Sequence, residues 1–542
     1  MTNNNFKSAL SQSLVYVSAY ACCLFILIAP IILQVCDTHD WTFLCTSILF
    51  ALPIAALLLT CKPKWITYVI LAILSIFTFA EVVMVASFGQ FIIAGNILAT
   101  LTTTAEESAS FAKNSIQLLW YFIPVIGAYG LLIFLLSCFE INRKFNIGVF
   151  GAALLIIVGF VGYKQVIFSN NTLTLRYYVE NRIWNRPPFN MFYQTHNIIK
   201  GQRIKKDISN AKYCNFEASK PELSQREIYV LGIGESMRYN NLSLNGQYNR
   251  STTPRLEALD NVILYDDYYS SSCLTMYSVP QILTRATPQD YALNYKEKSI
   301  FKPFQEVGFK TYCLVCKNLL TYEKYLTDGV DSLICVEGDK DIPRLIDSLS
   351  TIYPKTFFIV QFLGNHSFYY NYEPAFDVYK PNINDNPEDK SYQAYLNAYD
   401  NTMLYADYIL SEIIHNIDQP NTISSFVFVS DHGEILSEDT LDGGKYGHGG
   451  NCNPNKVEYH VPLIVWYSNK YAEVFPNKTI DVRRYSQRSV NADNIFYSVC
   501  DMADITIASQ YAKPEWSIFS DSLQDHTRYI LVPDGINYLK VE

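Results

Sequence analysis

The chain has 542 residues, of which 49% are hydrophobic, and a formal net charge of −9. This length exceeds that of one ordinary domain, and the acidic balance leaves no basic face of the kind that binds nucleic acid. The charge is unevenly distributed, because residues 1–162 hold only six Lys or Arg and six Asp or Glu. The pattern predicts an apolar N-terminal part and a separate acidic C-terminal part.

The N-terminal part contains five long apolar runs. A bilayer core of about 30 Å needs about 20 apolar residues per helix. Five such runs in series favour a membrane domain over the buried helices of a soluble protein. We expect a transmembrane domain over residues 1–163, with helices near 13–35, 42–61, 65–88, 116–138 and 146–163.

The basic residues of this part predict its orientation. Lys62 and Lys64 lie between the second and third runs, and Arg143 and Lys144 lie between the fourth and fifth. Because Lys and Arg collect in cytoplasmic loops, we expect the N-terminus in the cytoplasm. Five crossings then place the remainder of the chain on the far side of the membrane, in a periplasm or outside the cell.

Seven of the 13 cysteines lie in this exported part. An oxidising compartment favours disulfides, so we expect disulfides there. The odd number leaves at least one thiol unpaired within the chain, and the sequence does not give the connectivity. Cys313 and Cys316 form a C-x-x-C pair, for which a structural cysteine or disulfide is a better interpretation than a redox site, since no redox motif surrounds it.

The exported part divides into a linker and a folded domain. Residues 164–225 are polar and interrupted by proline, which predicts a linker with amphipathic helices. From residue 226 to 542, short apolar runs alternate with helical segments, a pattern typical of an α/β/α domain with a mainly parallel sheet. Helices are expected at 278–286, 340–350, 391–417 and 491–503. Strands are expected at 227–234, 262–266, 310–315, 332–336, 356–363, 425–430 and 461–467.

Acids and histidines follow three of the predicted strands. The carboxyl ends of parallel strands meet at one edge of a sheet, and ligands bind at that edge. Glu, Asp and His together suit Zn²⁺, which takes oxygen and nitrogen ligands. We therefore expect a metal site drawn from Glu235, His366, Asp431, His432 and the glycine-flanked His448.

The segment 270–280, SSSCLTMYSVP, offers hydroxyl groups to such a metal. A hydroxyl bound to Zn²⁺ loses its proton more easily and becomes a nucleophile. A helix that opens at Ser278 would also present backbone N–H groups to an anion, although Ser278 fits an ordinary helix N-cap. Spacing alone does not choose among Ser271, Ser272, Thr275 and Ser278.

Taken together, the motifs resemble those of one enzyme family. They are the segments GIGESMRYNN, TMYSVPQILTRAT, GNHSFYY, VSDHGE and YGHGG. The chain is similar to the phosphoethanolamine transferases of Gram-negative inner membranes, which belong to the alkaline phosphatase/sulfatase superfamily. The resemblance covers nearly the whole chain, because that family also has five membrane helices followed by a periplasmic catalytic domain.

The resemblance implies a metal centre with a nucleophile in it. Glu235 of the G-E-S motif, Asp431 and His432 match the family's zinc ligands. Thr275 matches the threonine that is both a zinc ligand and the nucleophile carrying phosphoethanolamine. We therefore expect one tight Zn²⁺ site at these four residues.

The resemblance also implies residues that contact the substrates. His366 and His448 match histidines that contact the phosphoryl group or a second metal. Thr103 and Glu107 fit the family's loop that touches the donor headgroup. A solvated loop is the alternative interpretation of that last segment.

The resemblance implies a zinc-dependent phosphotransferase of the bacterial inner membrane, and we expect a monomer without a nucleic-acid partner. It would transfer phosphoethanolamine from phosphatidylethanolamine to a lipopolysaccharide, on lipid A or the core, or to a related envelope glycan. A phospho-threonine would be the intermediate. The sequence does not decide which acceptor is used.

Three other activities are alternatives to this one. A sulfatase is disfavoured, because the stretch that begins at Cys273 lacks the Pro and Arg of the Cys/Ser-x-Pro-x-Arg signature. A glycerol-phosphate transferase of the lipoteichoic acid synthase type shares the five-helix layout and the threonine nucleophile. A metal-dependent phosphohydrolase would use water as the acceptor. The last two alternatives stay open.

Overall fold

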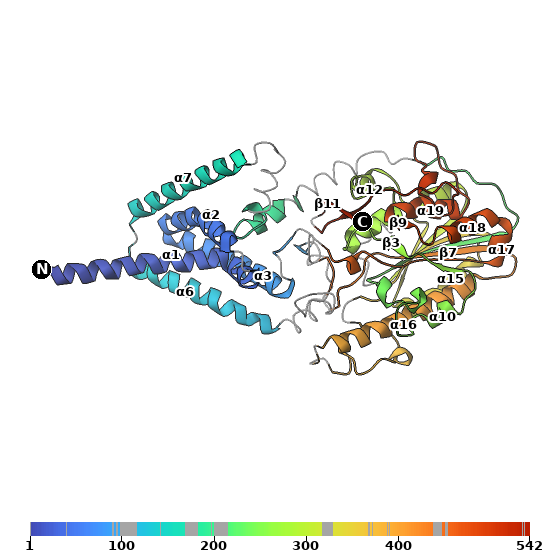
Figure 1. Ribbon diagram of the computed structural model, residues 1–542, viewed down its shortest axis with the longest axis horizontal. Coiled ribbons are helices and arrows are strands. Elements are labelled where there is room, and N and C mark those ends of the chain that lie inside the picture. The colour runs from blue at the N-terminus through green and yellow to red at the C-terminus, as the bar shows by residue number, and fades with distance from the viewer. Residues whose placement is uncertain are drawn as a thin grey trace. The chain divides into compact units, whose positions relative to one another are not determined.

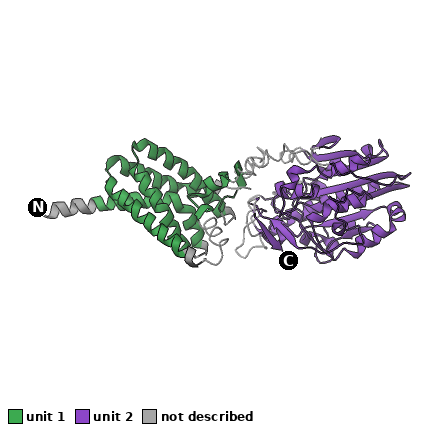
Figure 2. Cartoon of the chain, turned by 90° about the horizontal axis from the view of Figure 1, so that it is seen from above, with its two compact units in different colours: residues 1–201 green, residues 202–542 purple. Residues whose placement is uncertain are grey.

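The structure is a computed structural model with two compact units, residues 1–201 and residues 202–542 (Figure 2). The predicted linker, 164–225, spans the boundary between these units, and its limits stay a prediction. The structure describes residues 2–541 except 39–40, 89–90, 94–95, 98–115, 141, 168–182, 197, 200–214, 317–328, 367–368, 371, 387–388, 390, 437–446, 450–453, 534 and 536.

The first unit is a bundle of long apolar helices. Helix α1 packs against α2, α3 and α6, and α7 packs against α2 (Figure 1). Five helices are long and apolar enough to cross a membrane, which confirms the five predicted spans. The helices are α1 (Thr2–Thr38), α2 (Trp41–Thr60), α3 (Lys64–Phe88), the 3-10 helix η1 (Ile116–Tyr121), α6 (Phe122–Cys138) and α7 (Arg143–Ile167).

The second unit is built on a seven-stranded sheet in the order β2-β8-β7-β1-β6-β4-β5. Strand β8 pairs antiparallel with both neighbours, and the other pairings are parallel. Each strand overlaps a predicted one, which confirms the mainly parallel sheet. The strands are β1 (Arg226–Gly234), β2 (Val262–Leu264), β4 (Lys310–Cys316), β5 (Ser332–Val336), β6 (Lys355–Gln361), β7 (Thr422–Ser430) and β8 (Leu463–Tyr467). Two small sheets pair β3 (Asp267–Tyr269) with β9 (Ser489–Asn491) and β10 (Arg528–Leu531) with β11 (Tyr538–Val541).

Helices cover both faces of the large sheet. In Figure 1, α10, α15 and α16 lie on one side of it, and α18 and α19 lie on the other. Every residue of β7 is buried, because a central strand covered on both faces has no solvent side. The α-helices are α10 (Pro254–Glu257), α11 (Thr275–Leu283), α12 (Leu293–Lys296), α13 (Phe301–Glu306), α15 (Ile342–Ser350), α16 (Tyr392–Ile417), α17 (Asn469–Val474), α18 (Pro476–Arg484) and α19 (Ile495–Met502). The 3-10 helices are η3 (Tyr239–Asn241), η4 (Ser243–Asn245), η6 (Asp339–Asp341), η7 (Pro374–Phe376), η9 (Lys456–Glu458), η10 (Ala492–Asn494) and η11 (Pro514–Trp516).

One predicted helix begins earlier than expected. The sequence places its start at Ser278, because proline is favoured in the first helical turn. In the structure α11 begins at Thr275, with Leu274 as its N-cap residue, and Pro280 lies inside the helix. The difference moves Thr275 from a loop to the first residue of a helix.

The described cysteines of the second unit form no disulfide. No disulfide joins any two of Cys273, Cys313, Cys316, Cys335 and Cys500. The C-x-x-C pair lies within β4, where residues three apart point to opposite faces of the sheet, so no bond can join them. The expectation of disulfides is wrong for these five residues. Cys214 and Cys452, the other two cysteines of this part, lie outside the described residues.

Candidate active site

Three neighbouring strands bring the predicted site together. Strand β1 lies between β6 and β7, and all three run parallel. Gly234 at the end of β1 pairs with Ser430 at the end of β7. Glu235 and Asp431, the next residues along each strand, therefore leave the sheet side by side.

The chain turns sharply after Glu235. Ser236 adopts a left-handed backbone conformation with φ of 57°, which is uncommon for a residue other than glycine. Its N–H donates to Oδ1 of Asp431 at 3.1 Å, and its carbonyl accepts the hydroxyl of Tyr399 at 2.7 Å. Tyr399 lies on α16, so this helix fixes the turn that presents Glu235.

Thr275 reaches the same point from α11. Its Oγ1 lies 3.1 Å from Nε2 of His432 and 3.4 Å from Oε2 of Glu235. Because Thr275 is the first residue of α11, the positive end of the helix dipole lies beside its hydroxyl. The arrangement brings a hydroxyl, a carboxylate and an imidazole together in a buried cluster.

The other candidate hydroxyls are engaged elsewhere or lie apart from this cluster. Ser271 donates to Oδ1 of Asp493 at 3.3 Å, and Ser272 donates to the Leu531 carbonyl at 3.0 Å. Ser278 lies inside α11 and is fully buried, and its hydroxyl has no hydrogen-bond partner among the described residues. Of the four hydroxyls, Thr275 is the one that contacts the cluster.

The spacing of the side chains suits a small tetrahedral cation. Nε2 of His432 lies 3.4 Å from Oε1 of Glu235, 3.3 Å from Oδ2 of Asp431 and 3.1 Å from Oγ1 of Thr275. Ligands held about 2.0–2.1 Å from one zinc ion in a tetrahedron lie about 3.3–3.4 Å from one another. The distances from His432 to the other three side chains thus match those expected between ligands of a tetrahedral zinc ion.

A buried acceptor without a partner supports the same interpretation. Asp431 is fully buried, and its Oδ1 accepts the N–H groups of Ser236 and His432. Its Oδ2 has no hydrogen-bond partner among the described residues. Such atoms are rare in proteins, and a cation in the cluster would be the missing partner.

The electrostatics of the two carboxylates also call for a cation. Burial, and then the charge of Asp431, raise the pKa of Glu235 well above its usual range. Burial raises the pKa of Asp431 to about 6. In the described part of the chain, no Lys or Arg pairs with either carboxylate, and their basic neighbours are the imidazoles of His432 and His448. A divalent cation would compensate both charges and return these carboxylates to their ionised form.

His432 is oriented as a metal ligand. Its Nδ1 lies 2.9 Å from the Gly433 carbonyl, so an Nδ1–H group donates there and the lone pair is left on Nε2. Burial, and then the neighbouring charge of His448, lower the pKa of His432 well below its usual value. The ring is therefore neutral and presents Nε2 to the other ligands.

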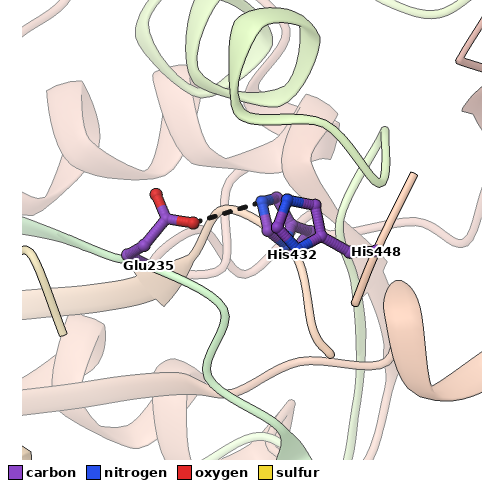
Figure 3. A group of neighbouring side chains, drawn as sticks. All are labelled: Glu235, His432 and His448. Carbon is purple, nitrogen blue, oxygen red and sulfur yellow. Dashed lines mark ion pairs between the residues drawn. The ribbon is translucent and has the colours of Figure 1, made fainter. Parts of the chain in front are cut away.

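His448 adds a second imidazole ring beside that of His432. Figure 3 shows the carboxylate of Glu235 facing the two imidazole rings, whose centroids are 3.8 Å apart. Ligand atoms of Glu235, His432 and His448 lie within 4.8 Å of one another, so these three residues also meet the geometry of a metal site. This set contains His448, whereas the sequence predicts Asp431 and Thr275 as ligands beside Glu235 and His432.

A second carboxylate holds His448 in place. Nδ1 of His448 lies 2.8 Å from Oε2 of Glu434, and Oε1 of Glu434 accepts the hydroxyl of Tyr369 at 3.0 Å. Burial lowers the pKa of His448, but the charge and hydrogen bond of Glu434, together with the charges of Asp431 and Glu458, outweigh burial, so the pKa lies above its usual value. His448 can therefore carry a proton and present its Nε2 to a ligand.

The loop that carries His448 is anchored beside the start of α11. The N–H of Gly449 donates to Oε1 of Glu458 at 2.8 Å. Gly449 has φ of +63°, and a Cβ atom here would collide with the side chain of Leu274. Because Leu274 is the N-cap of α11, this contact fixes the position of His448 relative to Thr275.

The remaining predicted residues have different outcomes. His366 follows β6 in a half-buried loop, and its charge contributes to the lowered pKa of His432. Thr103 and Glu107 lie outside the described residues. Their predicted contact with a donor headgroup stays a prediction.

Sequence reasoning missed Glu434, Tyr369 and Glu458. Glu434 stands two residues after His432 in the quoted DHGE motif, which is the signal that could have identified it. Tyr369 lies in the quoted GNHSFYY motif, three residues after His366, whereas Glu458 lies in a segment that carries no comparable pattern. Their roles depend on contacts between loops that are distant in the sequence.

Comparison with known proteins places this arrangement in a family. The sequence pattern of the sulfatase family matches residues 227–505, just over half of the chain. The chain belongs to the sulfatase family. The matched region contains Glu235, Thr275, His366, Asp431, His432 and His448, and it contains none of the membrane helices. The family assignment therefore concerns the second unit.

Curated relatives are similar over part of their length. Phosphoethanolamine transferase EptC of Escherichia coli strain K12 is 26% identical over 332 residues, which cover 57% of this chain and 56% of the relative. Phosphoethanolamine transferase EptA of Salmonella typhimurium is 26% identical over 302 residues, which cover 52% and 54%. The chain thus spans about half the length of the curated relatives it matches.

Solved structures share the fold of this sulfatase-family chain. The integral membrane protein lipooligosaccharide phosphoethanolamine transferase A of Neisseria meningitidis superposes with a TM-score of 0.72 at 19% identity, covering 93% of this chain and 97% of that one. The C-terminal periplasmic domain of EptC from Escherichia coli, in complex with Zn, superposes with a TM-score of 0.53 at 24% identity, covering 61% and 96%. The first of these matches extends the shared architecture to the helical unit.

Proposed function

We propose that the chain transfers phosphoethanolamine from phosphatidylethanolamine to a lipopolysaccharide or a related envelope glycan. The proposed intermediate is a phosphoethanolamine ester of Thr275. The names of the curated relatives and the arrangement of the cluster both support this reaction. The acceptor, on lipid A, on the core or on another glycan, is left to experiment.

One observation carries the proposal. The hydroxyl of Thr275 lies 3.1 Å from Nε2 of His432 and 3.4 Å from the carboxylate of Glu235, at the first residue of a helix. A hydroxyl in this position can act as a nucleophile, because it has groups beside it that favour loss of its proton and a helix dipole that favours negative charge.

Glu235, Thr275, Asp431 and His432 would hold one zinc ion. When bound, zinc would supply a lowered pKa for the Thr275 hydroxyl and compensation for the charge of the phosphoryl group. His432 is held in the required tautomer by the Gly433 carbonyl. A second metal between His366 and His448 is an extension of the same proposal.

In the first half-reaction, Oγ1 of Thr275, whose proton has already been released to solvent, attacks the phosphorus of phosphatidylethanolamine. The bond between phosphorus and the diacylglycerol oxygen breaks, and diacylglycerol leaves after taking up a proton. His448 is suited to donate that proton from Nε2, because Glu434 accepts from its Nδ1 and raises its pKa. His366 would help to balance charge on the phosphoryl oxygens.

In the second half-reaction, an acceptor oxygen attacks the same phosphorus. The bond from phosphorus to Oγ1 of Thr275 breaks, and His448 takes up the proton that the acceptor loses. Thr275 is restored, and the acceptor carries the phosphoethanolamine group. Water as the acceptor would turn the same site into a phosphohydrolase.

Sulfate-ester chemistry is not favoured despite the family name. Sulfatases use a formylglycine made from a Cys or Ser, and the candidate here, Cys273, is fully buried. Burial raises the pKa of this thiol well above its usual value. Thr275, and not Cys273, occupies the position beside Glu235 and His432.

The proposed location is the bacterial inner membrane. The five apolar helices would anchor the chain with its N-terminus in the cytoplasm, and the catalytic unit would lie in the periplasm. Both the donor and a glycolipid acceptor are held in a bilayer, so an anchored enzyme would meet them at the membrane surface.

The test compares cells that express the native chain with cells that express Thr275→Ala. Mass spectrometry of the envelope glycolipids and glycans should show a gain of one phosphoethanolamine on a single component in the first strain alone. The purified chain should release diacylglycerol from fluorescent phosphatidylethanolamine and not from phosphatidylglycerol. Release of glycerol phosphate would favour the lipoteichoic acid synthase type of reaction, and release without any modified acceptor would favour a hydrolase.

A further inference from the structure

One cavity, of about 690 Å³, lies in the second unit. A smaller cavity in the helical unit has the more distinctive chemistry. This second cavity has a volume of about 420 Å³. Its walls come from α1, α2, α3, α6 and the first residue of α7. It lies where the α2–α3 and α6–α7 connections meet, which is the end of the bundle predicted to face the cytoplasm.

The rim of this cavity is cationic. Lys62, Lys64 and Arg143 line it, and Glu140 is the one acid among its lining residues. Lys64 donates to the Leu136 carbonyl and so caps the end of α6. Lys62 and Arg143 are exposed, and neither makes a salt bridge with the part of the chain that the structure describes.

Helix ends add to the positive potential. Helix α3 begins at Lys64 and α7 begins at Arg143, so the positive ends of two helix dipoles lie beside the cavity, although the N–H of Lys144 already donates to Oδ1 of Asn142 at 2.9 Å. Helices α2 and α6 end at the same place, and their carbonyl groups oppose this effect. Two of those carbonyls already accept hydrogen bonds. Lys64 donates to the Leu136 carbonyl, and the Thr67 hydroxyl donates to the Leu58 carbonyl at 2.9 Å.

The inner wall of the cavity and its flanks are apolar. Leu58, Leu59 and Phe139 line the cavity beneath the cationic rim. On the outer surface of the bundle, Trp65 follows Lys64 with 63% of its surface exposed, and Phe145 lies near Arg143 with 51% exposed. A free phosphate ion would use only the cations, whereas a phospholipid would use the apolar surface as well.

We propose that this cavity binds the headgroup of an anionic phospholipid. The phosphate lies between Lys62 and Arg143, and the acyl chains run along the exposed apolar faces of α3 and α7. Basic pockets between membrane helices on the cytoplasmic side favour anionic headgroups for this reason. The site does not depend on the proposed transferase activity, because its ligand and its residues are different.

The test measures lipid retention by the purified full-length chain. Native mass spectrometry follows the binding of phosphatidylglycerol and of phosphatidylethanolamine with identical acyl chains. The native chain should retain phosphatidylglycerol in preference. Arg143→Gln should weaken this binding about fivefold, as expected for one basic residue near a headgroup, and the double variant K62Q/R143Q should weaken it further.

Lys144 offers a matched control. It is the next residue on α7, is exposed and does not line the cavity. Lys144→Gln removes the same charge and should leave retention unchanged. The charge-preserving variant K62R/R143K should bind as the native chain does, which separates loss of the site from loss of folding.

Three results would overturn the proposal. The first is equal retention of the two lipids by the native chain. The second is equal loss of phosphatidylglycerol by Arg143→Gln and Lys144→Gln, which would mean a diffuse charge effect. The third is that inorganic phosphate, without lipid, raises the melting temperature as much as phosphatidylglycerol does, which would mean a free-anion site.

Discussion

Nδ1 of His448 lies 2.8 Å from Oε2 of Glu434, although His448 belongs to a glycine-flanked loop and Glu434 follows the end of β7. The carboxylate is fully buried and also accepts the hydroxyl of Tyr369. It therefore orients His448 and holds a negative charge next to it. Four testable predictions follow from this contact and from three others in the second unit.

Replacing Glu434 by Gln should impair turnover more than substrate binding. The change removes the charge that raises the pKa of His448 and gives Nδ1 a neutral partner. We expect kcat to fall about 10–100-fold, as for other groups that orient a catalytic imidazole, with little change in KM. Steady-state kinetics with fluorescent phosphatidylethanolamine measure both. Tyr369→Phe removes only the other hydrogen bond of Glu434 and should retain most activity; an equal loss in both variants would contradict the role given to the charge.

Removing zinc should reverse the sign of the stability change caused by Asp431→Asn. In the metal-free chain, two buried carboxylates face each other without a metal partner, so Asp431→Asn should stabilise that form by about 1–3 kcal/mol. In the zinc-loaded chain the same substitution should destabilise, because a charged ligand is lost. Thermal unfolding with chelator and with added zinc gives both signs. A melting temperature of the native chain that does not respond to either treatment would be evidence against the metal site.

Asp493 should make stability depend on pH. Burial raises the pKa of this carboxyl group to about 7, whereas an unfolded Asp has a pKa of about 3.9. Between these values the folded chain binds more protons than the unfolded chain, so the free energy of unfolding falls as pH rises from about 4 to about 7. Asp493→Asn lacks this dependence. Its stability relative to the native chain should therefore increase over that range, as measured by thermal unfolding at pH 5 and pH 8, and parallel curves would refute the assignment.

Gly449→Ala should damage both stability and activity. The residue has φ of +63°, and a Cβ atom would collide with Leu274, next to Thr275. Gly246 provides a control, since it has φ of +69° and open space around it. Gly246→Ala should be destabilised only by the strain of the left-handed backbone, about 1–2 kcal/mol. Gly449→Ala should lose more stability and should also have a lower kcat. Equal melting temperatures and equal activities of the two variants would show that the contact with Leu274 is unimportant.

The sheet of the second unit was predictable because burial on both faces leaves a simple pattern. Central strands such as β1 and β7 read as short continuous apolar runs, and residues at their ends must share one edge. That rule alone brings Glu235, Asp431 and His432 together. It could not predict the short sheets formed by β3, β9, β10 and β11, because strands of three or four residues carry almost no periodicity.

No local pattern chooses among the four candidate hydroxyls, and only the family resemblance points to Thr275, which the structure brings beside Glu235 and His432. Pro280 indicates a helix start near Ser278, but tertiary packing begins α11 three residues earlier, at Thr275. The same packing assigns Ser271 and Ser272 to hydrogen bonds with Asp493 and Leu531. Contacts of this kind join segments more than 200 residues apart, so no local pattern contains them.

Glu235 and Asp431 follow the ends of two paired strands, although they are 196 residues apart in the sequence. A slip of one residue between β1 and β7 would displace Asp431 by about 3.3 Å, which is more than a zinc site tolerates. If the site binds zinc as proposed, the chain can capture the ion only after these strands have paired in the correct register. Metal loading would then act as a checkpoint for completed folding, and a chain that stalls before β7 has paired would remain empty.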